Sequence, residues 1–443
     1  MNIWVIGASR PQFEVATATA VVKSVAHAVV DSGHVLPHEP LMLSEWDIAE
    51  SLTPELKAMI HTADVVVVVI ATFVGADMVI KILDGVSDKA ILWALPEPSV
   101  GVGRLQLNSL CGALMTHNAL QGLSRDVPVI YGNPAARETQ EEFVRHIRVA
   151  STIRVLQGTT LGIVGQRPPG YYPSDFDELQ LQRVFGVQIR RFALSEAFRY
   201  ATATSQNMVD HEVSLASEQL ENMDQVPAKQ LTQSVRAEQG LEALVLEHHL
   251  TSICVECWPQ YMTEYGGAVC WAHSQLIDKG IMAGCEADVH GTLSMILCQT
   301  LSGVSPFFGD LVHVTENDRL VFWHCGAAPL SLAGEKPRAS IHPNRRVGLT
   351  VDFPLKPGPV TVVRLHRTST GGYLLMAIPG EAQNDPLYFS GNSVGVKPTS
   401  GARKVLAQLL EDGAEHHFAV GYNVFAEDIE LLGQRLKIPV KVY

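Results

Sequence analysis

The stretch Val65-Val-Val-Val-Val-Ile70 is an unbroken run of β-branched residues. Such a run is typical of a strand that is buried on both faces, as the strands of parallel sheets are. On either side of this run in the sequence, five segments have strand-like or helix-like patterns. The strand-like ones are Ile3–Ile6, Ala90–Leu95 and Val127–Tyr131, and the helix-like ones are Glu14–Asp31 and Glu138–Ile153. Strands that alternate with helices predict a parallel, doubly wound sheet, which we place in a first α/β domain over residues 1–155.

A second α/β domain is predicted over residues 156–302. It opens on the strand-like Thr160–Val164, which Gly165 ends, and it contains a second buried strand pattern at Ser252–Val255. Helical spacing occurs over Met208–Asn222, Val235–His248 and Ala268–Lys279. The alternation of elements is the same as in the first domain, so we expect the same class of fold.

The pattern of predicted secondary structure changes from about Val304 onward. Short strand patterns alternate with Gly, Pro and Asn turns, which is typical of a β-barrel or a β-sandwich. These patterns are Leu311–Val314, Leu320–Trp323, Val347–Phe353, Val360–Arg367, Tyr373–Ile378 and Phe418–Tyr422. The chain then closes with a predicted helix at Asp428–Leu436 and a strand at Val440–Tyr443. We therefore predict a β-rich C-terminal domain over residues 303–443.

The composition limits the classes of function. The chain has 443 residues, 47% of them apolar, and a formal net charge of −13, which argues against non-specific binding to nucleic acid. The longest apolar run, Val65–Ala76, is too short to span a bilayer, and Met1–Ile6 lacks the basic region of a signal peptide. We predict a protein without a membrane partner.

Cysteine usage predicts a reducing compartment. The seven cysteines are odd in number, and all but Cys111 fall between residues 254 and 325, which is not a disulfide framework. The cytoplasm is therefore the predicted location. Cys254 and Cys257 form a C-x-x-C pattern, but no second pair follows at the spacing of a zinc ribbon. We interpret both as small buried residues.

Several common site motifs do not occur in the sequence. Gly7-Ala-Ser-Arg10 and Gly101-Val-Gly103 lack the rest of the G-x-G-x-x-G fingerprint, and no G-x-x-x-x-G-K-[ST] loop is found. There is no G-x-S-x-G nucleophile elbow either. The sequence therefore gives little support to nucleotide binding or to nucleophilic catalysis.

The stretch Gly284–Gly326 concentrates acids and a histidine among apolar residues. Glu286 and Asp288 follow a predicted strand, Asp310 follows Pro306-Phe-Phe-Gly309, and His324 follows Leu320-Val-Phe-Trp323. Charged groups in apolar surroundings are costly to bury unless they are paired or hold a metal. Carboxylates with a neutral imidazole suit Mn²⁺ or Mg²⁺ better than zinc, and open positions would remain for substrate oxygens. Further along the chain, His416 and His417 add two imidazoles.

Each of these residues also has a purely structural interpretation. Asp288 is as well placed to be a helix N-cap as a ligand. His324 alone would more often be a hydrogen-bonded core histidine, and Asp310 alone a turn residue. Together they favour a metal site.

Several short motifs resemble the L-fucose isomerase/L-arabinose isomerase family. They are Cys257-Trp-Pro259, Cys285-Glu-Ala-Asp-Val289, Leu301-Ser-Gly303, Gly309-Asp-Leu311, His324-Cys-Gly326 and Glu415-His-His417. The resemblance implies two Rossmann-like doubly wound α/β domains followed by a domain that contains a β-barrel. It implies Mn²⁺ as the cofactor, with Mg²⁺ or Co²⁺ as alternatives, and Glu286, Asp310 and His417 as ligands, with His324 as an additional one. The dipeptide does not decide between His416 and His417, and we favour His417.

The function implied is that of a metal-dependent aldose–ketose isomerase that works through an ene-diolate. Glu286 and Asp310 would act as the acid/base pair. The substrate would be an aldose such as L-fucose or arabinose or, as in a sulfoquinovose isomerase-like branch of short relatives, the sulfosugar sulfoquinovose, converted to sulfofructose. Predicted substrate contacts are His324, His416, Asp288, Trp258 and Arg10.

A sulfonate would need several N–H donors. The candidate donors in loop-like contexts are Arg10, Arg104, Arg167, Arg345 and Arg346. The resemblance also implies a homo-oligomer, a trimer or a hexamer. The alternative function is a non-catalytic sugar-binding or regulatory protein on the same fold.

Overall fold

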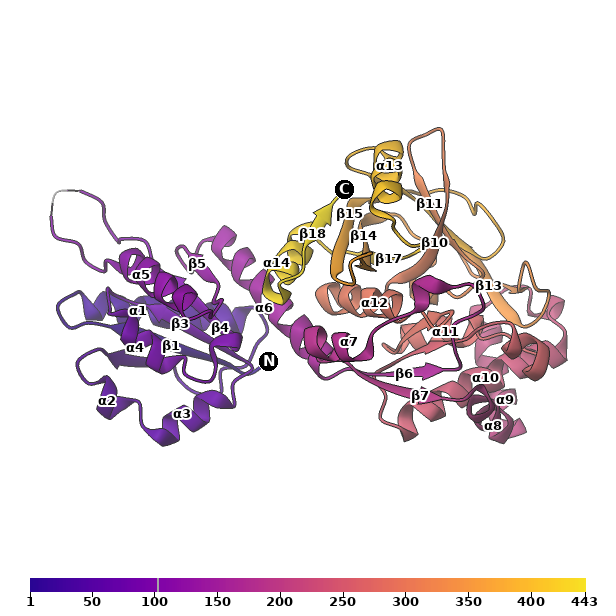
Figure 1. Cartoon of the computed structure of the whole chain (residues 1–443), viewed down its shortest axis with the longest axis horizontal. Helices are drawn as coiled ribbons and strands as arrows, with labels where there is room; N and C mark the ends of the chain where they lie inside the picture. The colour runs from indigo at the N-terminus through magenta and orange to yellow at the C-terminus, as the bar shows by residue number, and fades with distance from the viewer. Residues whose placement is uncertain (102) are drawn as a thin grey trace. The chain divides into compact units, whose positions relative to one another are not determined.

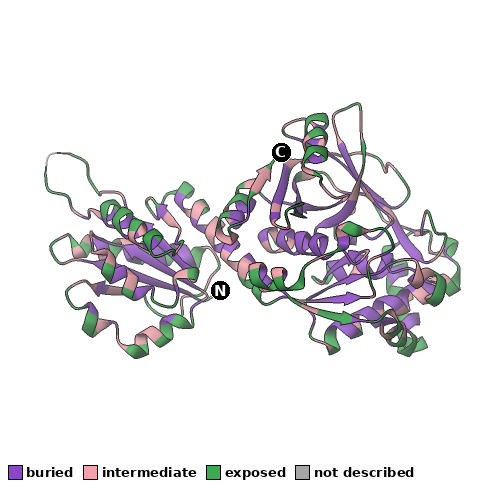
Figure 2. Cartoon of the chain, viewed as in Figure 1, coloured by how far each residue is buried: buried purple, intermediate pink, exposed green. Residues whose placement is uncertain are grey.

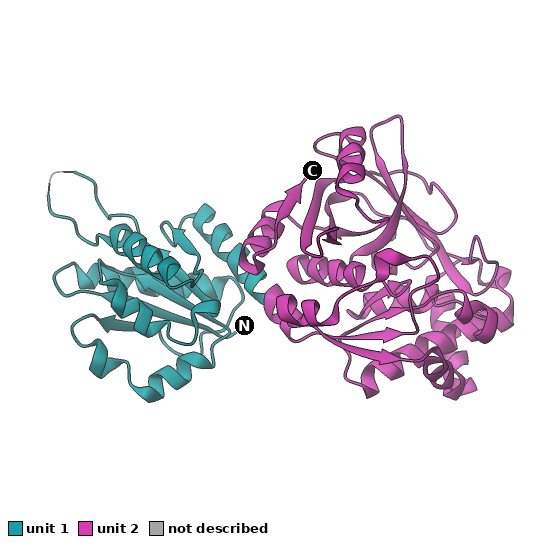
Figure 3. Cartoon of the chain, in the orientation of Figure 1, with its two compact units in different colours: residues 1–151 teal, residues 152–443 magenta. Residues whose placement is uncertain are grey.

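The computed structural model describes residues 1–101 and 103–443. The chain divides into two compact units, Met1–Ser151 and Thr152–Tyr443 (Figure 3). Each unit has its own buried sheet, and the exposed residues gather on the outward faces of the helices (Figure 2). Among the described helices, none combines the length and the apolar character that crossing a bilayer requires.

Unit 1 is built on a five-stranded parallel sheet with the strand order β2-β1-β3-β4-β5 (Figure 1). The strands are β1 (Ile3–Ser9), β2 (Leu41–Ser44), β3 (Val65–Ile70), β4 (Ala90–Ala94) and β5 (Val129–Tyr131). The helices are α1 (Val15–Asp31), α2 (Ile48–Ser51), α3 (Pro54–His61), α4 (Ala76–Ile82), α5 (Ser109–Gly122) and α6 (Arg137–Gln157), the last of which continues into unit 2. This strand order is one of the common doubly wound arrangements.

The central strand β3 is buried on both faces, as its sequence predicts. Val66, Val68 and Ile70 pack into one apolar cluster with residues of α4 and α5. The alternate residues of the same strand, Val65, Val67 and Val69, pack into a second cluster with residues of α1 and α6. Successive side chains of a strand point to opposite faces, so an all-apolar strand needs helices on both sides.

Unit 2 begins with a second parallel sheet, in the order β7-β6-β8-β9. Its strands are β6 (Thr160–Val164), β7 (Gln188–Phe192), β8 (Ser252–Val255) and β9 (Met282–Cys285). Its helices are α7 (Glu178–Phe185), α8 (Leu194–Ala203), α9 (Gln206–Gln219), α10 (Ala228–Glu247), α11 (Cys270–Asp278) and α12 (Val289–Ser302). The short β9–α12 connection becomes important for the site.

The rest of unit 2 contains a closed antiparallel barrel of six strands, in the circular order β16-β11-β10-β17-β14-β15-β16. The barrel strands are β10 (Phe307–Val314), β11 (Leu320–His324), β14 (Gly358–Arg367), β15 (Tyr373–Ala382), β16 (Asn392–Pro398) and β17 (His417–Tyr422). Attached to it are β12 (Arg338–Ile341), β13 (Leu349–Pro354), β18 (Val440–Val442), α13 (Ala402–Asp412) and α14 (Ala426–Leu436). Helix α12 packs against β14 and β17 of the barrel.

The predicted fold class is confirmed as mixed α/β with parallel sheets and a C-terminal β-barrel. Two local predictions are corrected. Strand β10 begins at Phe307, before the predicted Leu311, because Gly309 lies within the ladder instead of ending it. Strand β7 was not predicted, because the charged residues of Gln188–Phe192 conceal it on an exposed sheet edge. The predicted division of unit 2 at residues 302–303 coincides with the end of α12 and stays a prediction.

Candidate functional site

The turn between β9 and α12 presents Glu286 at the carboxyl end of a parallel strand, where sheets of this type bind ligands. Glu286 and Ala287 both adopt left-handed backbone conformations, with φ of 58° and 52°. Non-glycine residues in this region are strained by about 1–3 kcal/mol each, and such strain concentrates at functional sites. Asp288 then caps α12 by accepting a hydrogen bond of 2.8 Å from the Gly291 N–H, which confirms its interpretation as a helix N-cap.

Two barrel strands bring Asp310 and His417 together. Asp310 lies on β10 directly opposite His417 on the antiparallel strand β17. The distance from His417 Nε2 to Asp310 Oδ1 is 3.2 Å, and to Glu286 Oε2 it is 3.4 Å. The sheet register and the β9–α12 turn therefore place the Glu286 and Asp310 carboxylates next to the same ring nitrogen.

The other ring nitrogen of His417 is held by a buried ion pair. His417 Nδ1 lies 3.1 Å from Asp288 Oδ2, and Arg364 Nη1 donates to the same oxygen over 2.6 Å. Burial raises the pKa of Asp288, but the charge of Arg364 and the bond to His417 outweigh it and hold that pKa well below its ordinary value. An ionised carboxylate can only accept, so Nδ1 carries a proton and Nε2 is the nitrogen that faces Glu286 and Asp310.

The atoms around His417 Nε2 could hold a cation. His417 Nε2 faces two carboxylates, and Asp310 Oδ1 is buried without a hydrogen-bond donor among the described residues. A proton on Nε2 bonds well to one carboxylate at a time, whereas a divalent ion could be shared between the nitrogen and the carboxylates. Ligands at right angles, about 2.1–2.4 Å from a shared ion, lie about 3.0–3.4 Å apart. The distances of 3.2 and 3.4 Å from His417 Nε2 match this spacing, and the oxygen–nitrogen donor set fits a manganese-type ion. Glu286, His416 and His417 also offer ligand atoms that lie within 4.8 Å of one another.

His416 lies beside His417 but is oriented differently. Its Nε2 is 3.5 Å from Glu286 Oε2 and 4.0 Å from Asp310 Oδ1, and its side chain is 38% exposed against 1% for His417. Burial lowers the pKa of His416, but the contact with Glu286 and the charge of Asp310 raise it overall. Burial likewise raises the pKa of Glu286, but His416, His417 and Trp258 together lower it. Glu286 is thus held as a carboxylate.

An aromatic wall adjoins the carboxylates. Trp258 Nε1 donates to Glu286 Oε1 over 3.1 Å, and the ring of Tyr171 lies edge-on to those of Trp258 and His416 at 5.3 and 5.8 Å. The guanidinium of Arg345 lies over the Trp258 ring, 4.7 Å from its centre. The Trp258 side chain therefore lies between the positive charge of Arg345 and the Glu286 carboxylate.

Comparison with known proteins identifies the family. The chain is 35% identical over 383 residues to the sulfoquinovose isomerase of Alkalicoccus urumqiensis, with 85% of each chain covered. It is 34% identical over 376 residues to that of Priestia megaterium and 31% identical over 377 residues to that of a Clostridium species, with 84% of each chain covered. The chain belongs to the sulfoquinovose isomerase family. No protein-family model matches it.

Membership of the sulfoquinovose isomerase family confirms the prediction of an enzyme of the aldose–ketose isomerase class. Among solved structures, a carbohydrate transporter solute-binding protein from Agrobacterium radiobacter, in complex with D-arabinose, covers 68% of this chain and 88% of its own. Its identity of 12% and TM-score of 0.17 are too low to inform the fold or the function.

The structure places the other predicted residue of the C-terminal half, His324, beside the cluster. His324 is buried at the end of β11, with its ring centre 6.2 Å from that of His417. Its Nδ1 lies 3.4 Å from the sulfur of Cys325. In the described part of the chain it forms no ion pair with Glu286 or Asp310, and its contacts with the cluster are with the rings of His417 and Phe308.

The five arginines predicted as candidate sulfonate donors lie in different surroundings. Arg10 belongs to unit 1, where its guanidinium pairs with Glu45 and stacks over Phe73. Arg104 donates to the Gln12 carbonyl in the same unit. Arg167 pairs with Asp175 over 2.7 Å beside a cavity of about 790 Å³, whose lining includes Ala287 but not Glu286. Arg345 and Arg346 are exposed, and Arg345 forms no ion pair with a described residue.

Sequence reasoning missed two residues that the structure places at the site. Arg364, the cation that pairs with Asp288, is fully buried in β14. An arginine inside the apolar run Val360–Leu365 was the available signal, because a buried guanidinium needs a fixed anionic partner. Tyr171 belongs to the turn-rich loop Gln166–Ser174, and nothing in its local pattern distinguishes it from a surface tyrosine.

Proposed function

We propose that the chain interconverts sulfoquinovose and sulfofructose by aldose–ketose isomerisation with a bound Mn²⁺ ion. The observation that carries the proposal is that carboxylate oxygens of Glu286 and Asp310 lie 3.4 and 3.2 Å from His417 Nε2. The sugar is proposed because the relatives are sulfoquinovose isomerases. Mg²⁺ and Co²⁺ are the alternative ions, since the donor set is the same for them.

The ligands would be Glu286, Asp310 and His417. His417 is favoured over His416 because Asp288 holds it in the tautomer that exposes Nε2, as the outer partners of metal-bound histidines do. We assign Asp288 to this supporting role, since its carboxylate is 1% exposed and already contacts Arg364, His417 and the Gly291 N–H. His416 and Trp258, which both contact Glu286, would line the sugar.

The bound ion would supply electrostatic stabilisation of the negative charge that develops on the sugar oxygens. The chemistry requires two proton movements: one proton passes from C2 to C1, and another passes from O2 to O1. One of the two carboxylates, Glu286 or Asp310, removes the C2 proton and returns it at C1 through an ene-diolate of the sugar. The other carboxylate assists the transfer between the oxygens. Tyr171 and Trp258 form the wall that keeps the sugar against these groups.

A substrate panel tests this function. Sulfoquinovose, D-glucose, L-fucose, D-arabinose and L-arabinose are each incubated with the Mn²⁺-loaded protein, and ketose formation is followed by nuclear magnetic resonance. We expect the highest kcat/KM with sulfoquinovose. A preference for a neutral pentose or for L-fucose would replace the proposed substrate while leaving the reaction type in place.

Arg345 is the arginine best placed to bind the sulfonate. It lies over Trp258, whose indole N–H contacts Glu286, and it has no carboxylate partner among the described residues. Hydrogen bonds from a guanidinium to an anionic group are charge-assisted and contribute about 1.5–3 kcal/mol. We therefore expect Arg345→Gln to raise the KM for sulfoquinovose about 10-fold or more, with kcat little changed.

The matched control for this prediction is Arg346→Gln, which removes a neighbouring exposed guanidinium. It should leave the KM close to that of the unchanged protein. Steady-state kinetics with both sulfoquinovose and D-glucose separates charge recognition from general damage, because glucose has no sulfonate. Equal losses on the two sugars would remove Arg345 from the sulfonate site.

Metal removal distinguishes the isomerase from the alternative, a sugar-binding or regulatory protein on this fold. After treatment with a chelator and dialysis, we expect turnover of sulfoquinovose to disappear and to return on addition of Mn²⁺. The apparent melting temperature should rise with Mn²⁺ concentration, because an ion that binds only the folded chain stabilises it. Turnover that persists without any divalent ion would contradict the metal-dependent mechanism.

The assembly and location remain predictions. We propose a homo-oligomer, a trimer or a hexamer, in the cytoplasm.

A further inference from the structure

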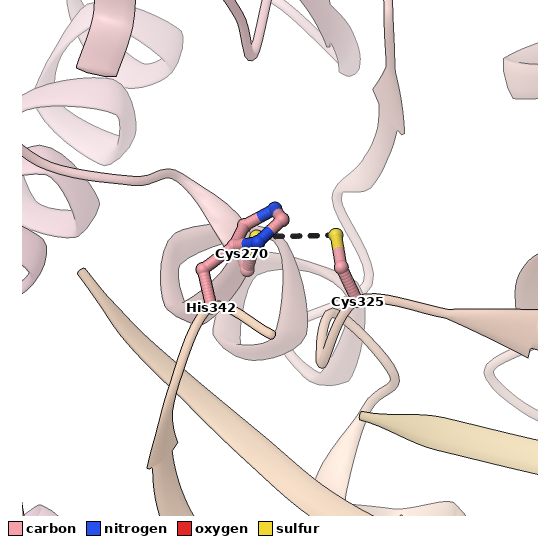
Figure 4. Close-up of side chains that lie close together, drawn as sticks. All are labelled: Cys270, Cys325 and His342. Atoms are coloured by element: carbon pink, nitrogen blue, oxygen red, sulfur yellow. Dashed lines mark hydrogen bonds between the residues drawn. The ribbon is translucent and has the colours of Figure 1, made fainter. Parts of the chain in front are cut away.

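Two thiols and an imidazole meet in unit 2 at a place that the proposed function does not use. Cys270, Cys325 and His342 each offer one ligand atom, and these atoms all lie within 4.8 Å of one another (Figure 4). The sulfurs of Cys270 and Cys325 are 3.6 Å apart. None of these residues coincides with Glu286, Asp310 or His417.

The three residues come from separate elements. Cys270 is the first residue of α11, Cys325 directly follows β11, and His342 directly follows β12. No local sequence pattern joins them, since 55 residues separate the two cysteines. The C-x-x-C pattern of Cys254 and Cys257 is not part of the cluster, and both of its cysteines are buried as predicted.

The geometry suits a soft, tetrahedral ion. Zinc–thiolate bonds are about 2.3 Å long, so two thiolates on one tetrahedral ion lie about 3.8 Å apart. The observed 3.6 Å is close to this value. Two thiolates and one imidazole also form a donor set that selects zinc over manganese, because sulfur is a soft ligand.

The surroundings allow an ion to enter and be retained. Cys270 and His342 are buried, whereas Cys325 is only half-buried, which gives the cluster a route to solvent. Ala268 and Ala327 form its apolar shell together with Met262. The backbone N–H of Arg345 lies 3.3 Å from His342 Nδ1, and ligation through Nε2 would put the ring proton on Nδ1 and give up this long contact.

We propose that Cys270, Cys325 and His342 form a second metal site, which binds Zn²⁺ with water as the fourth ligand. Binding releases the two thiol protons to solvent, since thiolates are the ligands. The site joins the start of α11 to the ends of β11 and β12, and so ties the second parallel sheet to the barrel domain. Its role is structural, and it is distinct from the carboxylate–histidine site proposed for catalysis.

Cobalt titration tests the proposal, because Co²⁺ bound to thiolate gives an intense near-ultraviolet charge-transfer absorption that carboxylate and imidazole ligands do not give. The full chain, kept reduced with a phosphine and freed of metals with a chelator, is titrated with Co²⁺. We expect the charge-transfer band to saturate at one equivalent per chain and to disappear on addition of Zn²⁺. Absence of the band in the unchanged protein would overturn the proposal.

Variants then assign the band to its ligands. Cys325→Ser, at the half-buried position, and Cys270→Ser should each abolish the two-thiolate band, and His342→Ala should weaken Co²⁺ binding at least 10-fold. Glu286→Gln should keep the band at full intensity. Loss of the proposed catalytic metal site would therefore leave the band unchanged, whereas absence of the thiolate site would remove it. A band that survives in the Cys270→Ser, Cys325→Ser double variant would place the thiolate ligands elsewhere and overturn the assignment. Zinc content by mass spectrometry, one equivalent per chain in the Glu286→Gln protein, provides the check that needs no cysteine variant to fold.

Discussion

Replacing Glu286 by glutamine is expected to lower kcat for isomerisation by about 10²–10⁴-fold, the range that positioned acid–base groups contribute. The amide keeps an acceptor for the Trp258 N–H, which now bonds to Glu286 Oε1, so the fold of the turn should persist. The amide cannot accept a proton from the sugar, however, and it is a poorer metal ligand than the carboxylate. Asp310→Asn should have an effect of the same order, because its carboxylate faces the same ring nitrogen.

Two measurements separate the roles of these acids. Steady-state turnover reports the chemistry, and Mn²⁺ binding followed by electron paramagnetic resonance reports the ligand role. Glu264→Gln is the control, since this exposed carboxylate belongs to the same unit and is not among the carboxylates of the described residues that pair with His417. Near-normal turnover of either the Glu286 or the Asp310 variant, with ion binding intact, would show that the acid–base pair has been misassigned.

The largest effect on stability is expected from Arg364→Met. Arg364 and Asp288 are 0% and 1% exposed and are joined by contacts of 2.6 and 3.3 Å. Methionine fills a similar volume but leaves the Asp288 carboxylate buried without its cation. Breaking one side of a buried ion pair costs about 3–5 kcal/mol. Chemical denaturation should show a loss of this size in the free energy of unfolding, together with lower turnover, because Asp288 also orients His417.

A double variant tests whether the uncompensated charge causes the loss. In Arg364→Met with Asp288→Asn, asparagine still caps α12 but carries no charge, so we expect part of the lost stability to return while turnover remains low. Arg338→Met, which breaks an exposed pair with Glu335, should change stability little. Strictly additive losses in the double variant would mean that Arg364 stabilises the fold independently of the Asp288 charge, through packing or through its second contact with Glu415.

The sequence was most informative where local patterns suffice. The β-branched run of β3, the helix cap at Asp288 and the change of texture near residue 304 each depend on neighbouring residues, and the structure confirms them. The acids and histidines of the cluster were identifiable because charge in apolar sequence is costly. What could not be predicted was the pairing of Arg364 with Asp288 over 76 residues, which depends on the register of the barrel against α12.

The same limit applies to the substrate wall. Tyr171 comes from a loop in the first third of unit 2, and its contact with His416 joins segments that no periodicity relates. Arg345 was one of five candidate arginines that the sequence alone could not rank. It stands out only once its position over Trp258 is known and Arg10, Arg104 and Arg167 are seen to have other partners.

The placement of His417 on β17, between β10 and β14 of the closed barrel, has a consequence for the order of events during folding. Glu286 and Asp310 are synthesised before the third proposed ligand, His417, which lies 131 residues beyond Glu286 in the chain. A nascent chain cannot assemble the proposed site until this late strand has inserted and the ring of strands has closed. An ion that needs all three groups would then slow unfolding far more than it speeds folding. Manganese would thus bind last, and it would stabilise a barrel that has already formed.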